Sequence, residues 1–188
     1  MTKRVALLGT RGIPALHGGF ETAVQYIGPG LVQRGWDVTV YCRNPGQTLT
    51  QFEGTRLVNL PALRLKSAET LSHTGLSAAH ALFQDFDVAI VFNSGNAPFL
   101  SPLKLRGLPV AVHVDGLEHQ RAKWAGLGAR YYRWAERPSV KHADAIIAAL
   151  RTGHEALATR AAALSDDEIA GPSGASDWDV AQVLSHLG

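Results

Sequence analysis

The stretch Val5–Thr22, VALLGTRGIPALHGGFET, decides the fold. It opens with the apolar run Val5-Ala6-Leu7-Leu8, which has the length and composition of a strand buried on both faces of a parallel sheet. Glycines and a proline then interrupt the chain until a helical pattern opens at Phe20. This order predicts an anion-binding loop, because backbone N–H groups without a side chain can approach a diphosphate and the helix N-terminus adds partial positive charge. The alternative is an ordinary tight connection between strand and helix.

The glycine spacing differs from that of two common phosphate loops. A dinucleotide-binding loop reads G-x-G-x-x-G and a Walker loop ends in Gly-Lys-Ser/Thr, and neither pattern is present. The segments GTRGIP, residues 9–14, and GGFET, residues 18–22, resemble the N-terminal domain of family 4 retaining glycosyltransferases of the GT-B type, in particular the rhamnosyltransferase-like branch. The resemblance implies a Rossmann-like domain, a nucleotide sugar as donor substrate and no metal or other cofactor. It places Arg11, Gly12, Gly18 and Gly19 near the donor diphosphate.

Composition indicates an ordinary globular protein with an uneven charge distribution. Hydrophobic residues make up 46% and charged residues 18% of the 188. One cysteine excludes a disulfide framework and a cysteine-based zinc site, and we see neither an 18-residue apolar run nor a signal peptide, so we expect a cytoplasmic protein. Residues 1–147 contain 16 Lys and Arg against 10 Asp and Glu, whereas residues 148–188 contain 2 against 6. This asymmetry predicts two parts of different origin.

Residues 1–147 alternate between strand-like and helix-like segments. The pattern predicts a helix over 20–34, kinked or split by Gly28-Pro29-Gly30, and a second helix over 67–83 in which Leu71, Leu76, Ala79 and Phe83 can share a face. A short helix is expected around 98–106. After the first strand, further strands are predicted over 37–42, 55–60, 88–92, 109–114 and 144–147. Strands joined by helical crossovers predict an α/β fold with a doubly wound parallel sheet, whose ligand binds at the carboxyl ends of the strands.

Two loops follow strands at that edge. Asn93-Ser94-Gly95-Asn96 could contact a sugar, although turns favour the same residues. The run from His113 to Trp124, HVDGLEHQRAKW, is similar to the D-G-x-E-W-x-R-x-K-W segment of the same glycosyltransferase branch. This resemblance makes Asp115 and Glu118 candidates for orienting acceptor hydroxyls or assisting proton transfer, and helix capping is the alternative. His113 either points into the same cleft or is a core histidine.

The helix predicted over 119–138 carries aromatic residues beside basic ones. Trp124, Leu127, Tyr131 and Trp134 fall on one side, and Lys123, Arg130, Arg133, Arg137 and Lys141 fall on an adjoining arc. Such a helix could rest on anionic lipid, which would make the protein membrane-associated. The alternative is an aromatic stripe packed in the core beside a solvated basic face.

Residues 148–188 depart from the glycosyltransferase pattern. The segments LSDDE, residues 164–168, PSG, residues 172–174, and WDVAQVLSHL, residues 178–187, resemble the start of the DinB-like mycothiol-dependent maleylpyruvate isomerase domain, a four-helix bundle. The resemblance implies an α-helical hairpin and puts His186 at a metal-ligand position. We expect no tightly bound metal, because the other ligands of that family would come from helices beyond this segment.

The sequence therefore predicts a glycosyltransferase acceptor-side domain over 1–147 and a helical hairpin over 148–188. Its expected partners are a nucleotide sugar and a glycan or lipid-linked acceptor, with no nucleic acid and with oligomerisation through the hairpin as an option. Because most donor contacts of GT-B enzymes are assigned to a second domain, we expect no sugar transfer by these residues alone. The alternatives are a fragment of a metal-binding isomerase and a non-catalytic interaction module.

Overall fold

The computed structural model describes most of the first 147 residues and two short strands beyond them. The described residues are 2–16, 18–43, 46, 48–63, 68–114, 126–147, 172–175 and 178–179. The chain divides into two compact units, 1–148 and 149–188. Each unit is considered by itself below.

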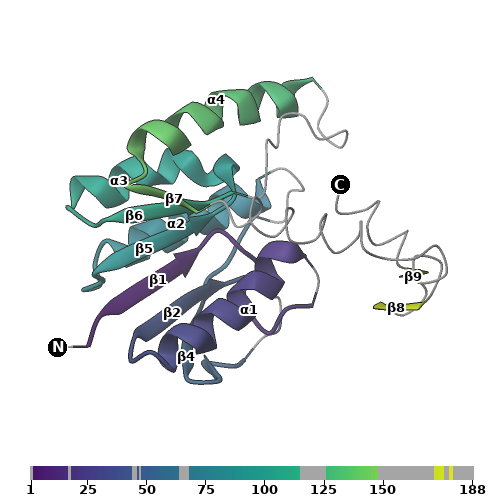
Figure 1. Ribbon diagram of the computed structural model, residues 1–188. Coiled ribbons are helices and arrows are strands. Elements are labelled where there is room, and N and C mark those ends of the chain that lie inside the picture. The colour runs from purple at the N-terminus through teal and green to yellow at the C-terminus, as the bar shows by residue number, and fades with distance from the viewer. Residues whose placement is uncertain are drawn as a thin grey trace. The chain divides into compact units, whose positions relative to one another are not determined.

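The first unit is built on a seven-stranded sheet (Figure 1). The sheet order is β3-β4-β2-β1-β5-β6-β7, and every neighbouring pair is parallel except β3 and β4. The strands are β1 Arg4–Leu8, β2 Asp37–Cys42, β3 Gln51–Phe52, β4 Thr55–Asn59, β5 Val88–Phe92, β6 Val110–His113 and β7 Ala145–Ile147. The predicted α/β fold with a doubly wound sheet is confirmed.

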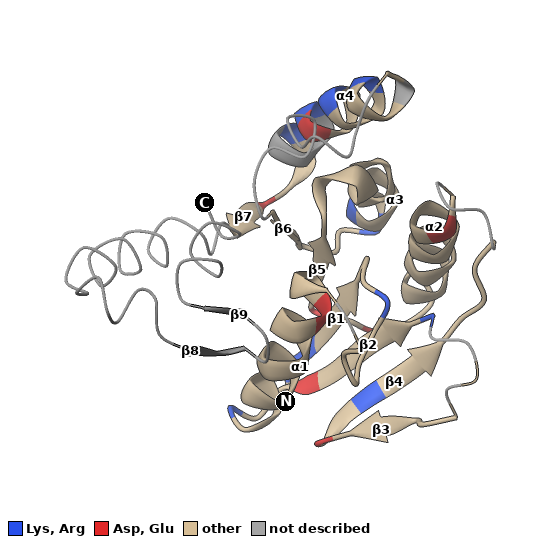
Figure 2. Cartoon of the chain, turned by 90° about the vertical axis from the view of Figure 1, so that its right-hand side faces the viewer, with Lys and Arg blue, Asp and Glu red and all other residues tan. Residues whose placement is uncertain are grey.

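Helices cover the two faces of this sheet unequally (Figures 1 and 2). The helix α1, Gly19–Val32, packs on one face through Val24, against Leu7 and Val40 among others. The opposite face is covered by α2, Glu69–Ala81, and α3, Leu100–Leu105, which follows the 3-10 helix η1, Ser94–Phe99. The helix α4, Leu127–His142, packs against η1 and α3.

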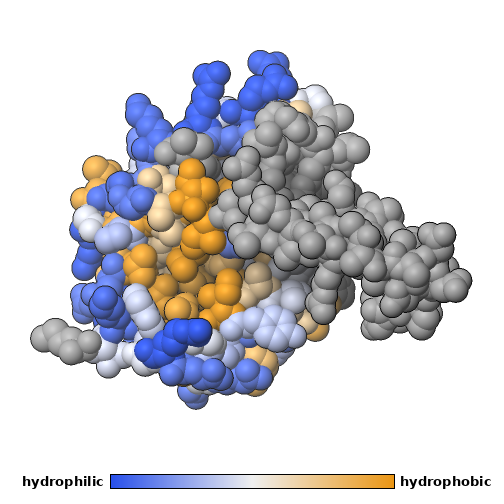
Figure 3. Space-filling view, viewed as in Figure 1, coloured by the Kyte–Doolittle hydropathy of each residue, from blue (hydrophilic) through white to orange (hydrophobic). Residues whose placement is uncertain are grey.

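Alternation along each strand explains the two hydrophobic clusters. In β1, Val5 and Leu7 join the cluster under α1, and Ala6 and Leu8 join the one under α2 and α3. On the α1 side, Ile90 of β5 is only half-buried and Ile147 of β7 is 36% exposed. The centre of Figure 3 shows this apolar surface between α1 and α4. Burial is least complete there, because α1 is the only described helix on that face and it packs on β2 and β4.

The structure corrects the predicted break in the first helix. Residues 19–32 form one continuous helix with Pro29 inside it, so the helix is not split. Gly28, which precedes Pro29, is buried, and a Cβ at this position would lie 3.1 Å from Thr55 Oγ1. The glycine therefore lets α1 lie close to β4. Arg34 Nη1 donates a hydrogen bond of 2.8 Å to the carbonyl of Gly30.

The apolar face predicted for the second helix is not the face that it buries. Leu76 is 47% exposed and Phe83, which follows α2, is 82% exposed. The buried residues of α2 are small or polar: His73, Thr74, Ser77, Ala78 and Ala81. Their hydroxyl groups donate to carbonyls one turn earlier, Thr74 to Thr70 and Ser77 to His73, at 2.8 Å each. Because these polar groups are satisfied within the helix, a small polar face can pack closely on the sheet.

Two short strand pairs were not predicted. β3 and β4 form a hairpin whose turn residues Glu53 and Gly54 both have positive φ, as a two-residue turn of this kind requires. In the second unit, β8, Pro172–Ala175, pairs antiparallel with β9, Trp178–Asp179. The predicted helical hairpin included residues 178 and 179, which are in a strand. Apart from these residues and those of β8, the predicted hairpin, 148–188, lies outside the described residues.

Candidate functional site

The glycine loop lies at the carboxyl end of β1 and is fastened to α1 and β2. The backbone N–H of Arg11 donates to Glu21 Oε1 at 2.9 Å, and the N–H of Ala15 donates to Gln25 Oε1 at 2.6 Å. The carbonyl of Arg11 accepts a hydrogen bond of 2.9 Å from the N–H of Arg43. The loop is thus held at the edge where ligands of doubly wound sheets bind.

The three glycines predicted to lie near the diphosphate have different surroundings. Gly12, with φ of 105°, packs on Cys42 so closely that an added Cβ would overlap Cys42 Sγ. Gly18, with φ of 102°, directly precedes α1, and a Cβ there would overlap the carboxylate of Glu21. Gly19 begins α1, and a Cβ there would meet no described residue within 4 Å. Gly12 and Gly18 therefore shape the loop, and Gly19 leaves open space at the helix N-terminus.

The N-terminus of α1 has no side-chain cap. Glu21 lies in the first turn, but its carboxylate binds the N–H of Arg11 instead of capping the helix. A helix N-terminus without a cap favours an anionic ligand, since its first N–H groups have no partner within the helix.

Arg43 was missed by the sequence analysis and lies beside this loop. It directly follows β2, and its side chain is only 6% exposed. Its nearest carboxylate is that of Glu69, with 3.7 Å between Nε and Oε1, which is too long for a hydrogen bond. Within the part of the chain that the structure describes, the buried Nε and Nη1 atoms have no hydrogen-bond partner. Burial lowers the pKa of Arg43, and the nearby Glu69 carboxylate opposes that shift.

Comparison with known protein families matches two segments of the chain. Residues 18–165 match the family described as glycosyl transferase 4-like domain. The chain belongs to this family. Residues 150–188 match the mycothiol maleylpyruvate isomerase N-terminal domain, so both predicted resemblances are confirmed. The first match begins at Gly18, passes the predicted boundary at 147 and overlaps the second over 150–165. A search of curated proteins found no match.

His113 connects two parts of the glycosyltransferase domain. It ends β6 and is 7% exposed. Its ring stacks on Phe92 with centroids 5.1 Å apart and meets the edge of Phe20 at 5.7 Å. Since Phe20 is the second residue of α1, the aromatic contact joins the end of β6 to the end of the glycine loop. Asp115 and Glu118 follow His113 but lie outside the described residues, as does His186.

The loop after β5 has a structural role. Asn93, with φ of 72°, accepts a 2.7 Å hydrogen bond from the N–H of Gly95 through its side chain. Asn96 is fully buried, and its Nδ2 donates to the carbonyl of Phe92 at 2.8 Å and to that of Gly9 at 3.4 Å. These contacts support the turn interpretation of residues 93–96.

The other side chains and hollows of the domain give weaker indications of a functional site. Burial raises the pKa of the Cys42 thiol to about 11, so it stays protonated near neutral pH. Among the described residues, no cluster of three or more His, Cys, Asp or Glu side chains could hold a metal ion.

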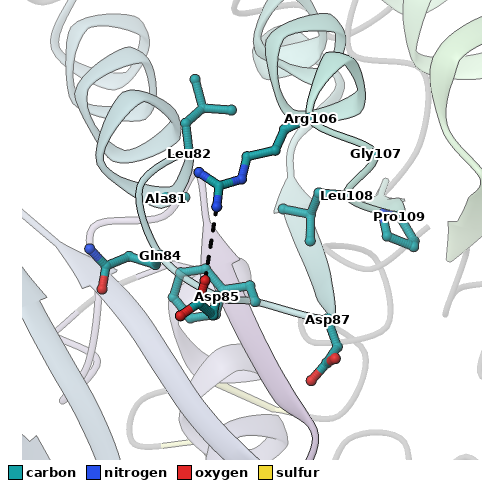
Figure 4. A pocket seen from close by; sticks show the side chains of 10 residues that line it. Ala81, Leu82, Gln84, Asp85, Asp87, Arg106, Gly107, Leu108 and Pro109 are labelled. Atoms are coloured by element: carbon teal, nitrogen blue, oxygen red, sulfur yellow. Dashed lines mark ion pairs between the residues drawn. The ribbon is translucent and has the colours of Figure 1, made fainter.

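A hollow of about 310 Å³ lies at the opposite, amino end of β5 and β6 (Figure 4). It contains the Arg106–Asp85 ion pair at 3.9 Å, and because Asp85 is 89% exposed, that pair is a weak surface contact.

Proposed function

We propose that residues 1–147 form the acceptor-side domain of a glycosyltransferase that moves a hexosyl or rhamnosyl group from a nucleotide sugar to a glycan or lipid-linked acceptor. Family membership supports sugar transfer in general. The observation that carries the finer proposal is the buried guanidinium of Arg43 beside the glycine loop at the start of α1. Its Nε and Nη1 atoms and the N-terminus of α1 have no side-chain hydrogen-bond partner among the described residues. Arginine is well suited to phosphate because its planar group can donate two parallel hydrogen bonds.

In this proposal the loop and the end of β6 have different tasks. Gly18, Gly19 and Arg11 lie near the donor diphosphate, Arg43 supplies positive charge there, and the N-terminus of α1 adds backbone donors. Asp115 and Glu118 orient acceptor hydroxyls or assist proton transfer, and His113 positions the end of β6. The nucleotide sugar is the donor substrate, with no metal in the reaction.

A titration of the purified chain with a nucleoside diphosphate and with pyrophosphate tests the anion site. Charge-assisted hydrogen bonds contribute about 1.5–3 kcal/mol, so Arg43→Gln should weaken binding by roughly tenfold to a hundredfold. Gly19→Val should leave the circular dichroism spectrum unchanged, because the added side chain enters open space. It should still weaken binding, because that side chain would lie where the backbone meets the phosphate. Arg34→Gln, which removes an exposed arginine elsewhere on the domain, is the matched control.

Two outcomes would contradict the anion site. One is equal binding by Arg43→Gln and Arg34→Gln. The other is loss of folding in Gly19→Val without a separable loss of binding. Because residues 1–147 alone are not expected to transfer sugar, the roles of Asp115 and Glu118 are tested by binding. Titration with a lipid-linked acceptor should show weaker binding by Asp115→Asn and Glu118→Gln than by the native chain.

A second candidate function rests on the match of residues 150–188 to an isomerase domain. It would place a metal ligand at His186. Metal analysis of tag-free protein separates the candidates, because near-stoichiometric metal that is lost in His186→Ala would favour the isomerase.

A further inference from the structure

One surface of α4 is rich in cations and faces away from the domain. Figure 2 shows that Lys and Arg recur along this helix, and hydrophilic side chains gather at the top of Figure 3 where α4 lies. At about 100° per residue, five side chains fall within an arc of about 100°. We call them the α4 basic surface: Arg130, Arg133, Trp134, Arg137 and Lys141.

The opposite side of α4 fixes the direction of this surface. Ala135 is fully buried. The hydroxyl of Tyr131 donates a 2.6 Å hydrogen bond to the carbonyl of Gly95 in η1, and a Cβ on Gly95 would lie 2.8 Å from the Tyr132 ring. The helix therefore sits tightly on η1. Trp134 is 57% exposed, so the prediction that it packs in the core is wrong.

The charges of the α4 basic surface are not neutralised within the part of the chain that the structure describes. No ion pair there involves Arg130, Arg133, Arg137 or Lys141. Like charges three and four residues apart on a helix repel each other, so the arrangement costs stability when nothing is bound. Glu136 is the only acidic residue of α4, and it lies outside the arc.

The surface also contains a hollow suited to a phosphate group. Arg130, Arg133, Trp134 and Arg137 line a space of about 240 Å³. An arginine side chain can donate two parallel hydrogen bonds to the oxygens of one phosphate group. The indole ring of Trp134 combines an apolar body with one polar N–H. Tryptophan beside basic residues is typical of the membrane–water interface, where the lipid headgroups lie.

We propose that the α4 basic surface binds the surface of an anionic phospholipid membrane. The array from Arg130 to Lys141 extends about 16 Å along one helix, which fits a layer of headgroups better than a single small anion. Trp134 lies among the cations and can enter the headgroup layer, whereas it would add no charge complementarity toward a nucleic acid backbone. No described helix is long and apolar enough to cross a membrane. The inference does not depend on the proposed sugar transfer.

Sedimentation with phosphatidylcholine vesicles, with and without phosphatidylglycerol, tests the proposal. Each basic residue near an anionic surface contributes about fivefold to binding, so Arg133→Gln/Arg137→Gln should weaken binding to the anionic vesicles by about thirtyfold. The control Arg34→Gln/Arg56→Gln removes two exposed arginines from α1's end and β4 and should bind like the native chain. Raising the salt to about 1 M should abolish binding, since the Debye length falls to about 3 Å.

Tryptophan fluorescence gives an independent reading. The emission of the native chain should shift to the blue on anionic vesicles, and Trp134→Ala should lose most of that shift. All these substitutions are at exposed positions, and circular dichroism checks that the variants fold. Equal losses in the two double variants, equal binding to both kinds of vesicle, or arginine-dependent binding of an RNA duplex with no binding of vesicles would each overturn the proposal.

Discussion

At the residue scale, neighbouring positions of similar type differ in function because their surroundings differ. Gly18 and Gly19 are adjacent in the sequence, yet only Gly18 has a positive φ and an obstructed Cβ position. The sequence predicted the loop but could not separate the two glycines, since backbone angles depend on how Glu21 reaches back to Arg11. The sequence prediction also missed Arg43. Its position directly after a predicted strand was a usable signal, because ligands bind at the carboxyl ends of strands in such sheets.

His73 gives a pH-dependent prediction at the same scale. It is fully buried in α2, and its Nε2 lies 3.0 Å from the carbonyl of Cys42. Burial lowers its pKa to about 4 from an ordinary value of 6.5. Because the unfolded chain then binds a proton that the folded chain refuses, stability is full above about pH 6.5 and decreases toward pH 4, by about 3 kcal/mol in total.

Urea unfolding at several pH values tests this prediction. His73→Gln keeps a donor for the Cys42 carbonyl and removes the titrating group, so its free energy of unfolding should decrease less between pH 7 and pH 4 than that of the native chain. Parallel decreases in the two proteins would show that another group causes the effect.

At the element scale, the strands were easier to predict than the faces of the helices. The β2 strand matches its predicted bounds, because continuous β-branched and apolar runs are typical of buried parallel strands. The buried face of α2 could not be found from hydrophobic spacing, since that face uses small and polar residues whose hydroxyls bond within the helix. Leu76 and Phe83 made the outward face look like the core.

Paired substitutions in α2 test the reversed face. Ala78 is 2% exposed, so Ala78→Leu should overpack the core and lower the free energy of unfolding by about 1–3 kcal/mol. Leu76→Gln, on the exposed side, should change it by about 0.5 kcal/mol or less. Urea denaturation of both variants measures the difference. If Leu76→Gln were the more damaging change, the originally predicted face would be the buried one.

At the scale of the whole molecule, the two units differ in charge and in family. The basic excess lies within 1–148 and the acidic excess within 149–188. Among the described residues, the members of both hydrophobic clusters belong to the first unit, from Val5 to Ala143. A domain with its own core can fold alone, and about 150 residues are enough to bury most of the surface that unfolding exposes.

We therefore predict that residues 1–148 fold without residues 149–188. The shortened chain should unfold cooperatively, with a free energy within about 1 kcal/mol of that of the sheet transition in the full chain, because it keeps every described residue of both hydrophobic clusters. Leu7→Ala identifies that transition, since removing this fully buried side chain should cost about 2–5 kcal/mol in either length of chain. Chemical denaturation monitored by circular dichroism measures both effects. A shortened chain that unfolds gradually, or that shows no response to Leu7→Ala, would mean that the acidic segment completes the fold of the sheet domain.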